Sequence, residues 1–361
     1  MLDAIWTGRG RRGRAIRALL APAETLYATI VAARGKLYDW RIFRAEEFSV
    51  PVWSVGNLSV GGTGKTPLVE WIANQLAQSG LRVTVLTRGY RRKSSGRVVV
   101  SDGSVVRSNV DEAGDEPFLL AQKLSGRAAV ICDTDRAAAA SWAIEYLKTD
   151  VFILDDAFQH QRITRDLNIL TIDASRPWGN GKLLPKGRLR EPITELSRAD
   201  CVVITRAVDS KQLNELRNEI ETKWPGMPTF VCSIEFAGLR KLEKLNSSPE
   251  VSTIRETPVA AFCGIGNPES FFSLVRGAGY QLKETRAFRD HYKYKQADID
   301  RFANHAAQSG AQAVLTTAKD AVKLKSFSFA LPCYVVEIAI QIEDEESFLE
   351  CINRAVDAHR A

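Results

Sequence analysis

The sequence lacks several patterns that mark common functional classes. Its six cysteines include no CxxC pair, which argues against a structural zinc site and against a dithiol redox centre. Most of them lie in apolar runs such as "CVVIT" and "AAFCGIG", where we expect buried free thiols in a reducing cytosol. No internal repeat or low-complexity tract interrupts the 361 residues, a length that allows two domains.

The sequence also has no large excess of positive or negative charge. The formal net charge is +6, and no platform of interleaved aromatic side chains accompanies the basic residues. Because single-stranded nucleic acid is usually bound by both features together, we predict no nucleic-acid partner. A modest positive charge is compatible with a nucleotide or an anionic membrane surface.

Long apolar runs are missing too, and this decides the interpretation of residues 1–49. Five arginines precede an apolar pattern at helical spacing that reaches Val31. Pro22, Glu24 and Arg34 interrupt it, so the run falls short of the about 20 apolar residues of a spanning helix. A signal peptide is rejected because the nucleotide loop described next requires cytosolic ATP. Two alternatives remain: a basic amphipathic segment on an anionic membrane surface, or a helix packed on the protein's own core.

The glycine-rich stretch "SVGNLSVGGTGKTP" (residues 54–67) is the first chemical motif. Residues 49–57 predict a buried strand before it, and residues 67–80 predict a helix after it. A loop in this place presents backbone N–H groups and the helix dipole to an anion. The complete pattern has glycine where this chain has Ser59, but the glycines nearest the helix form the phosphate-binding nest.

We therefore predict a nucleotide site in which Lys65 reaches the β- and γ-phosphates and the Thr66 hydroxyl binds Mg²⁺. Dimerising ATPases of the partitioning type have a lysine where this chain has Val60, which argues against that subgroup. The predicted nucleotide-binding residues are Ser59, Val60, Gly61, Gly62, Thr63, Gly64, Lys65 and Thr66.

Two acidic pairs are candidates for metal binding or proton transfer. The apolar run 151–154 predicts a strand buried on both faces, and it ends in Asp155 and Asp156. Carboxylates at such a strand end bind Mg²⁺ in P-loop enzymes, although an acidic pair can also cap a turn. Asp115 and Glu116 stand at the start of a predicted helix, where acids stabilise the helix dipole, hold a metal or take a proton.

Alternating strands and helices predict the fold class. Further strands are expected at 82–90, 128–136 and 201–206, with a helix at 137–148. This pattern predicts an α/β protein with a P-loop NTPase-like parallel sheet and helices on both faces. A strand–turn–helix pattern begins again at residue 255 and predicts a smaller C-terminal α/β domain. The predicted segments are residues 1–49, a P-loop core at 50–237, a linker at 238–254 and the second domain at 255–361.

Seven stretches resemble the tetraacyldisaccharide 4′-kinase family, and they span about residues 50–325 in the family's order. "DDAFQHQR" and "GNG…LLP…LREP" are specific to that family, whereas the phosphate loop alone is not. The family usually has proline at position 188 and often glycine at 157, where this chain has Arg188 and Ala157. The stretches are "SVGNLSVGGTGKTP", "TRGY", "GDEP", "DDAFQHQRITRDL", "GNGKLLPKGRLREP", "FRDHYKY" and "TTAKDAVKL".

The resemblance implies a kinase that uses ATP and Mg²⁺. It would transfer the γ-phosphate to the 4′-hydroxyl of an acylated glucosamine disaccharide-1-phosphate in lipid A biosynthesis. Such an enzyme would be peripheral to the cytoplasmic face of the bacterial inner membrane and would need no obligate protein partner. Because that substrate lies in a bilayer, the membrane-surface interpretation of residues 1–49 is favoured.

The resemblance also implies roles for individual residues. Lys65 and the loop amides would hold the phosphates, and Asp115 paired with His291 would take the proton from the attacking hydroxyl. The basic stretch 180–192 is either a solvated loop or a grip on the phosphate already on the substrate, with Arg190 as the best candidate for that contact. Spacing alone leaves His160 and His291 undecided between functional and structural roles. The implied Mg²⁺ residues, directly or through water, are Thr66, Glu116, Asp155 and Gln159; the implied supporting residues are Asp156 and His160.

The main alternative is a P-loop ATPase that acts as a nucleotide-dependent switch or transport factor. It shares the phosphate loop and the acidic strand end with the kinase hypothesis. Stimulation of ATP hydrolysis by a protein partner, with no phosphorylated lipid formed, would favour it.

Overall fold

A computed structural model describes residues 6, 10–207, 209–244, 254 and 256–360. Contacts within the chain define two compact units, and both are discontinuous in sequence. Unit 1 comprises Met1–Arg88, Asp133–Ser233 and Ile342–Ala361, and unit 2 comprises Gly89–Cys132 and Ile234–Gln341. The chain passes between the units inside strands β8 (Thr229–Lys241) and β12 (Cys333–Ile342).

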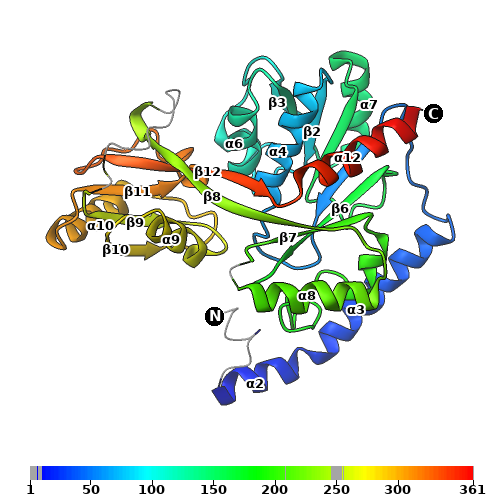
Figure 1. Cartoon of the computed structure of the whole chain (residues 1–361), viewed down its shortest axis with the longest axis horizontal. Helices are drawn as coiled ribbons and strands as arrows, with labels where there is room; N and C mark the ends of the chain where they lie inside the picture. Colours follow the sequence, from blue (N-terminus) through cyan, green and yellow to red (C-terminus); the bar gives the residue numbers. More distant parts are fainter. Residues whose placement is uncertain (1–5, 7–9, 208, 245–253, 255, 361) are drawn as a thin grey trace. The chain divides into compact units, whose positions relative to one another are not determined.

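Unit 1 is built on a parallel sheet with the strand order β7, β6, β1, β5, β2 (Figure 1). The first residues of β8 pair in parallel with β7. All residues of β1, β2, β5 and β7 are buried, as expected for strands that are covered on both faces. The bounds are β1 Val52–Gly56, β2 Val83–Thr87, β5 Val151–Asp155, β6 Leu167–Asp173 and β7 Cys201–Thr205.

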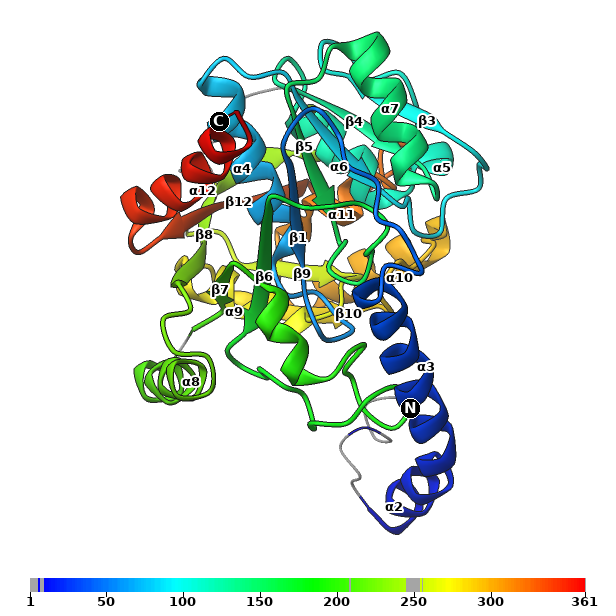
Figure 2. The ribbon, with the colours of Figure 1, turned by 90° about the vertical axis from the view of Figure 1, so that its right-hand side faces the viewer.

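Helices cover both faces of this sheet, as the sequence predicted. The ring of Phe348 on α12 lies 5.7 Å from that of Trp71 on α4 and 4.9 Å from that of Phe230 on β8. Figures 1 and 2 show α12 and α8 on opposite sides of the strands. The helices of unit 1 are α2 Gly10–Leu19, α3 Ala21–Asp39, α4 Lys65–Gln78, α7 Arg136–Leu147, the 3₁₀ helix η1 Ile193–Arg198, α8 Ser210–Lys223 and α12 Glu345–Arg360.

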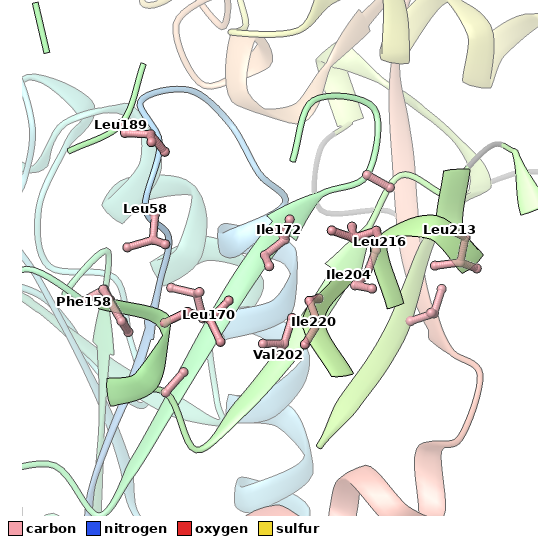
Figure 3. Close-up of a cluster of buried hydrophobic side chains, with 14 residues drawn as sticks. Leu58, Phe158, Leu170, Ile172, Leu189, Val202, Ile204, Leu213, Leu216 and Ile220 are labelled. Atoms are coloured by element: carbon pink, nitrogen blue, oxygen red, sulfur yellow. The ribbon is translucent and has the colours of Figure 1, made fainter. Parts of the chain in front are cut away.

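A hydrophobic cluster under α8 supports the loops at the sheet's edge (Figure 3). Alternate residues of β6 and β7 face this helix because successive side chains of a strand point to opposite faces. Leu58, Phe158 and Leu189 belong to the same cluster, so the loops that carry them are anchored to the core. The strand and helix members are Leu170, Ile172, Leu196, Val202, Ile204, Leu213, Leu216, Ile220 and Val231.

The N-terminal helices α2 and α3 form an arm of unit 1 (Figure 2). No residue of α3 is buried, so the alternative of a helix packed into the core is not what the structure shows. Leu19, Leu26 and Ile30 are 79%, 63% and 57% exposed. Among the described helices, none has the length and hydropathy that a membrane span requires.

Unit 2 contains a parallel sheet in the order β10, β9, β11, β12 and an antiparallel pair, β3 and β4. Alternate residues of β9 pack against α9 on one face and α10 on the other. The strand bounds are β3 Val98–Asp102, β4 Ala128–Cys132, β9 Val259–Cys263, β10 Leu282–Ala287 and β11 Ala313–Thr317. The helices are α5 Val110–Ala113, α6 Asp115–Lys123, the 3₁₀ helix η2 Leu242–Lys244, α9 Pro268–Gly277, α10 Gln296–Gln308 and α11 Ala318–Ala321.

Two details differ from the sequence predictions. The helix predicted beside Asp115 and Glu116 is α6, which begins at Asp115 itself. A short additional helix, α5, precedes it, and Gly114 with a φ of +91° separates the two. Residues 89–132, assigned from sequence to the P-loop core, group with residues 234–341 because α6 packs on α11. Much of the predicted linker, residues 245–253, lies outside the described residues; the domain boundaries therefore stay a prediction.

Candidate active site

The phosphate loop joins the central strand β1 to α4 in unit 1. Gly61 and Gly64 have φ angles of +126° and +80°, and α4 begins at Lys65, two residues earlier than predicted. Gly64 is the residue that precedes the helix, and its left-handed conformation turns the chain into it. The first N–H groups of α4 therefore end at the loop, where an anion is favoured.

Two threonines from neighbouring strands hold the loop in place. The hydroxyls of Thr63 and Thr171 lie 2.7 Å apart, and the Thr171 hydroxyl donates to the Gly56 carbonyl at 3.1 Å. The Thr205 hydroxyl donates to the Thr63 carbonyl at 2.9 Å. All three threonines are buried. The loop is thus fixed to β6 and β7 before any ligand binds, which reduces the ordering cost of binding.

Lys65 is held by two oxygens. Its ammonium donates to Asn57 Oδ1 at 3.1 Å and lies 3.5 Å from Asp156 Oδ1. Asn57 is itself buried and fixed by a hydrogen bond from its side-chain amide to the Ser59 carbonyl, 2.7 Å long. Sequence reasoning missed Asn57, although it stands in the quoted loop stretch directly after the strand.

The two aspartates at the end of β5 have different surroundings. Asp155 is 3% exposed and lies beside Val55 in the register of β1 and β5. Asp156 follows with a φ of +49°, and Arg190 Nη1 donates to both of its carboxylate oxygens, at 2.9 and 3.0 Å. Burial raises the pKa of Asp156, but the charges of Lys65 and Arg190 outweigh it and hold that pKa far below the usual range.

Gln159 connects this cluster to the chain on both sides. Its amide donates to the Asn57 carbonyl at 3.0 Å and to Glu191 Oε2 at 3.3 Å. Its side-chain oxygen accepts from Arg190 Nη1 at 3.2 Å. Lys65, Asp156, Gln159 and Arg190, which the sequence named separately, therefore form one hydrogen-bonded cluster in unit 1.

His160 lies on the same loop, but its environment is cationic. Burial and the nearby arginines, Arg136 and Arg165 foremost, lower the pKa of His160 to about 4. Its imidazole is consequently neutral at pH 7 and repels no neighbouring cation. His160 follows Gln159 of the hydrogen-bonded cluster directly in the chain, and its Nε2 atom makes no hydrogen bond in the structure.

Unit 2 carries the second acidic pair. His291 Nδ1 lies 3.2 Å from Asp115 Oδ2, and the ring of Tyr90 contacts the imidazole edge-on at 5.4 Å between centroids. His291 has a φ of +58°, and its backbone N–H donates to the Gly264 carbonyl. Burial raises the pKa of Asp115, but the His291 hydrogen bond and the Lys323 charge lower it below its usual value.

Two lysines in "TTAKDAVKL" were quoted from the sequence but given no role. Lys319 Nζ donates to Glu116 Oε1 at 2.6 Å and to Asp290 Oδ1 at 3.1 Å, and it lies 3.4 Å from His291 Nε2. Lys323 Nζ lies 3.2 Å from Asp115 Oδ2. Lys319 lies on α11 and Lys323 follows two residues after its end, so the two lysines pair with different carboxylates of the same unit.

Asp320 anchors Lys323 and the loop that bears His291. Its carboxylate is fully buried and accepts from Gly264 N at 2.9 Å, the Tyr294 hydroxyl at 2.9 Å and the Thr317 hydroxyl at 2.7 Å. Lys323 Nζ lies 3.2 Å from it. Gly264 accepts the N–H of His291, so one carboxylate supports both the loop that bears His291 and the lysine beside Asp115.

The predicted metal-binding residues are divided between the units. Thr66, Asp155 and Gln159 belong to unit 1, and Glu116 belongs to unit 2, where it is paired with Lys319. In the described part of the chain, no three His, Cys, Asp or Glu side chains are grouped as a metal site. Within unit 1, the hydroxyl of Thr66, the carboxylate of Asp155 and the amide oxygen of Gln159 are the donor type that Mg²⁺ prefers.

The chain matches known proteins over nearly its whole length. The model of the tetraacyldisaccharide-1-P 4′-kinase family matches residues 16–357. The tetraacyldisaccharide 4′-kinase of Geobacter metallireducens is 43% identical over 312 residues, which cover 86% of this chain and 89% of that protein. The enzyme of the same name from Desulfotalea psychrophila is 39% identical over 318 residues, 87% of this chain and 89% of that one.

A solved structure is similar over almost the whole length. LpxK from Aquifex aeolicus, crystallised in complex with ATP, is 35% identical, and the similarity covers 94% of this chain and 99% of that one. The TM-score is 0.75, so the α/β fold predicted from the sequence is confirmed. With a family match across residues 16–357 and relatives above 30% identity over most of both chains, the chain belongs to the tetraacyldisaccharide-1-P 4′-kinase family.

Proposed function

We propose that the chain transfers the γ-phosphate of ATP to the 4′-hydroxyl of an acylated glucosamine disaccharide-1-phosphate, a step of lipid A biosynthesis. The observation that carries this proposal is the family match over residues 16–357. The phosphate loop with its preformed Lys65–Asp156–Arg190 cluster supports it, because phosphoryl transfer depends mainly on positioned positive charge.

In this proposal the loop 59–66 binds the triphosphate. The N–H groups at the start of α4 and the Lys65 ammonium contact the phosphates, and Lys65 leaves Asp156 for the stronger negative charge of the nucleotide. Arg190 then remains with Asp156 and Gln159 and offers its other guanidinium nitrogens to the phosphate of the lipid substrate.

Thr66, Asp155, Gln159 and Glu116 are the proposed residues for Mg²⁺. The bound ion would neutralise charge on the phosphate oxygens during transfer. Because the Gln159 oxygen already accepts from Arg190, we propose that Gln159 acts through a water molecule. Asp155 is the strongest direct ligand candidate, since a buried carboxylate at a strand end has little freedom to move.

Asp115 and His291 are the proposed proton acceptors for the attacking hydroxyl. Their hydrogen bond fixes the imidazole, and Lys323 keeps Asp115 ionised. Lys319 lies beside His291 Nε2 and favours the tautomer that has its proton on Nδ1, facing Asp115. A dissociative transition state asks little of this base beyond correct placement.

We further propose that the protein acts at the cytoplasmic face of the inner membrane as a peripheral protein. The exposed apolar side chains Leu19, Leu26 and Ile30 on α2 and α3 support this, because a lipid substrate requires contact with a bilayer surface. Trp40, Ile42 and Phe43 continue the exposed apolar set directly after α3.

The test is incubation of the purified chain with γ-labelled ATP, Mg²⁺ and the detergent-dispersed disaccharide-1-phosphate. We expect label in the lipid, at the 4′ position by ³¹P NMR of the product. A matched substrate that lacks a free 4′-hydroxyl should stay unlabelled. Release of inorganic phosphate without labelled lipid would contradict the proposal and favour the nucleotide-switch alternative.

A further inference from the structure

Helix α3 carries two kinds of side chain with different partners. Leu26 and Ile30 are exposed and apolar, whereas Glu24, Tyr27 and Arg34 reach loops of unit 1. All five lie within three turns of one helix. A helix that served only as a membrane anchor would not need directed hydrogen bonds to the interior of the enzyme.

The polar contacts of α3 end on the residues of the phosphate cluster. The Tyr27 hydroxyl donates to the Arg190 carbonyl at 2.9 Å, and Arg34 Nη2 donates to the Gln159 carbonyl at 2.6 Å. Glu24 accepts from the backbone N–H of Leu183 at 3.1 Å and pairs with Lys186 at 3.1 Å. These contacts fix both ends of the basic stretch 183–190.

Arg190 and Gln159 are also joined to each other and to Asp156 through their side chains. A backbone shift at either residue would therefore move the Arg190 guanidinium relative to Asp156 and Lys65. No residue of α3 is buried in a core, and these hydrogen bonds tie the helix directly to this cluster. Burial raises the pKa of the Tyr27 phenol, so the hydroxyl stays protonated and donates across the physiological pH range.

We propose that Tyr27 and Arg34 are positioning residues that fix Arg190 and Gln159 from α3, so that the helix which faces the bilayer is also part of the phosphate site. This inference rests on the proposed kinase function for its activity readout. If the inference is correct, kcat depends on the orientation of α3, whatever fraction of the protein is bound to the membrane.

The test compares Tyr27→Phe and Arg34→Gln with two matched controls. Tyr146→Phe removes an exposed hydroxyl on α7, and Lys36→Gln removes a positive charge from the exposed face of α3. With detergent-dispersed substrate, each test variant should lose about 2- to 10-fold in kcat, the effect of one lost hydrogen bond. KM for ATP should change less than kcat, and both controls should retain the kcat of the unmodified chain.

Flotation with vesicles of phosphatidylethanolamine and phosphatidylglycerol separates positioning from anchoring. Tyr27→Phe should float like the unmodified chain despite its lower kcat, and Arg34→Gln should float like Lys36→Gln. Arg34→Lys, which keeps a donor, should recover part of the kcat. Backbone hydrogen exchange at residues 183–190 should rise in Tyr27→Phe and not in Tyr146→Phe.

Unchanged kcat in both test variants, or a loss of kcat that follows the loss of vesicle binding, would overturn the inference. If the unmodified chain labels no lipid, the proposed function fails instead. The inference is then judged by hydrogen exchange, and equal exchange at residues 183–190 in Tyr27→Phe and Tyr146→Phe would overturn it. Thermal melting of each variant shows that the fold is kept.

Discussion

Replacing Asp320 by alanine should destabilise unit 2 more than any exposed substitution. The carboxylate is fully buried. The Gly264 N–H and the Thr317 and Tyr294 hydroxyls donate to it, and the Lys323 ammonium forms an ion pair with it at 3.2 Å. Alanine would leave a backbone N–H, two hydroxyls and one side of an ammonium without their acceptor. Removing one partner of a buried ion pair costs about 3–5 kcal/mol.

Thermal and urea unfolding measure this effect. At about 2–4 °C per kcal/mol for a unit of this size, the melting transition that includes unit 2 should fall by about 10 °C. Asp320→Asn keeps the shape and one acceptor oxygen, so it should lose less stability than alanine. Glu269→Ala is the control, because it removes an exposed partner of Arg276 in the same unit and should cost less than about 1 kcal/mol.

A loss below about 1 kcal/mol for Asp320→Ala would refute this reasoning, since it would mean that the three donors and the ammonium find water or other acceptors at no cost. A loss equal to that of Glu269→Ala would have the same meaning. The kinase assay adds a second reading of the same variant, because Asp320 supports the loop that bears His291.

Three further predictions follow from the site. Lys323→Met removes a charge that lowers the pKa of Asp115, so the acidic limb of the kcat/KM profile should move to higher pH; an unchanged limb would exclude Asp115 as the titrating base. His160→Gln should make the stability of the protein less sensitive to acid. Because the pKa of His160 is about 4 in the folded chain, the unmodified chain should lose up to about 3 kcal/mol of its free energy of unfolding as pH falls from 6.5 towards 4. Parallel curves of unfolding free energy against pH for the two proteins would contradict this. Gly64→Ala should lower the free energy of unfolding by about 1–2 kcal/mol and weaken ATP binding, because the φ of Gly64 is +80° and a Cβ would lie 3.3 Å from Thr205 Cγ2. An affinity for ATP equal to that of the unmodified chain, measured by calorimetry, would contradict this.

Local patterns in the sequence were sufficient for several elements of unit 1, although β6, α8 and α12 were not predicted. The apolar runs at 49–57 and 151–154 became β1 and β5, because a strand buried on both faces needs apolar residues at every position. The helix after the phosphate loop was predicted two residues late, since the left-handed conformation of Gly64, which precedes the helix, is not visible in helix propensity. The short helix α5, which Gly114 separates from α6 with a φ of +91°, was not predicted.

The partners of the site residues were harder to predict, because they come from distant parts of the chain. The proximity of Asp115 and His291 followed only from the family resemblance, and the structure places the two side chains 3.2 Å apart. Nothing in the spacing of Lys319 indicated its contact with Glu116. The contacts of Tyr27 and Arg34 were missed because residues 1–49 were interpreted as a surface segment with no role in the site.

The ratio of kcat/KM between Lys65→Ala and the unmodified chain tests the central claim most directly. In the labelled-ATP assay with Mg²⁺ and the disaccharide-1-phosphate, we expect Lys65→Ala to lose at least about 100-fold, since this ammonium carries charge stabilisation in the transition state. Lys36→Ala is the matched control and should keep its rate. Full activity of Lys65→Ala would contradict the account, because the phosphate loop would then not be the site of transfer.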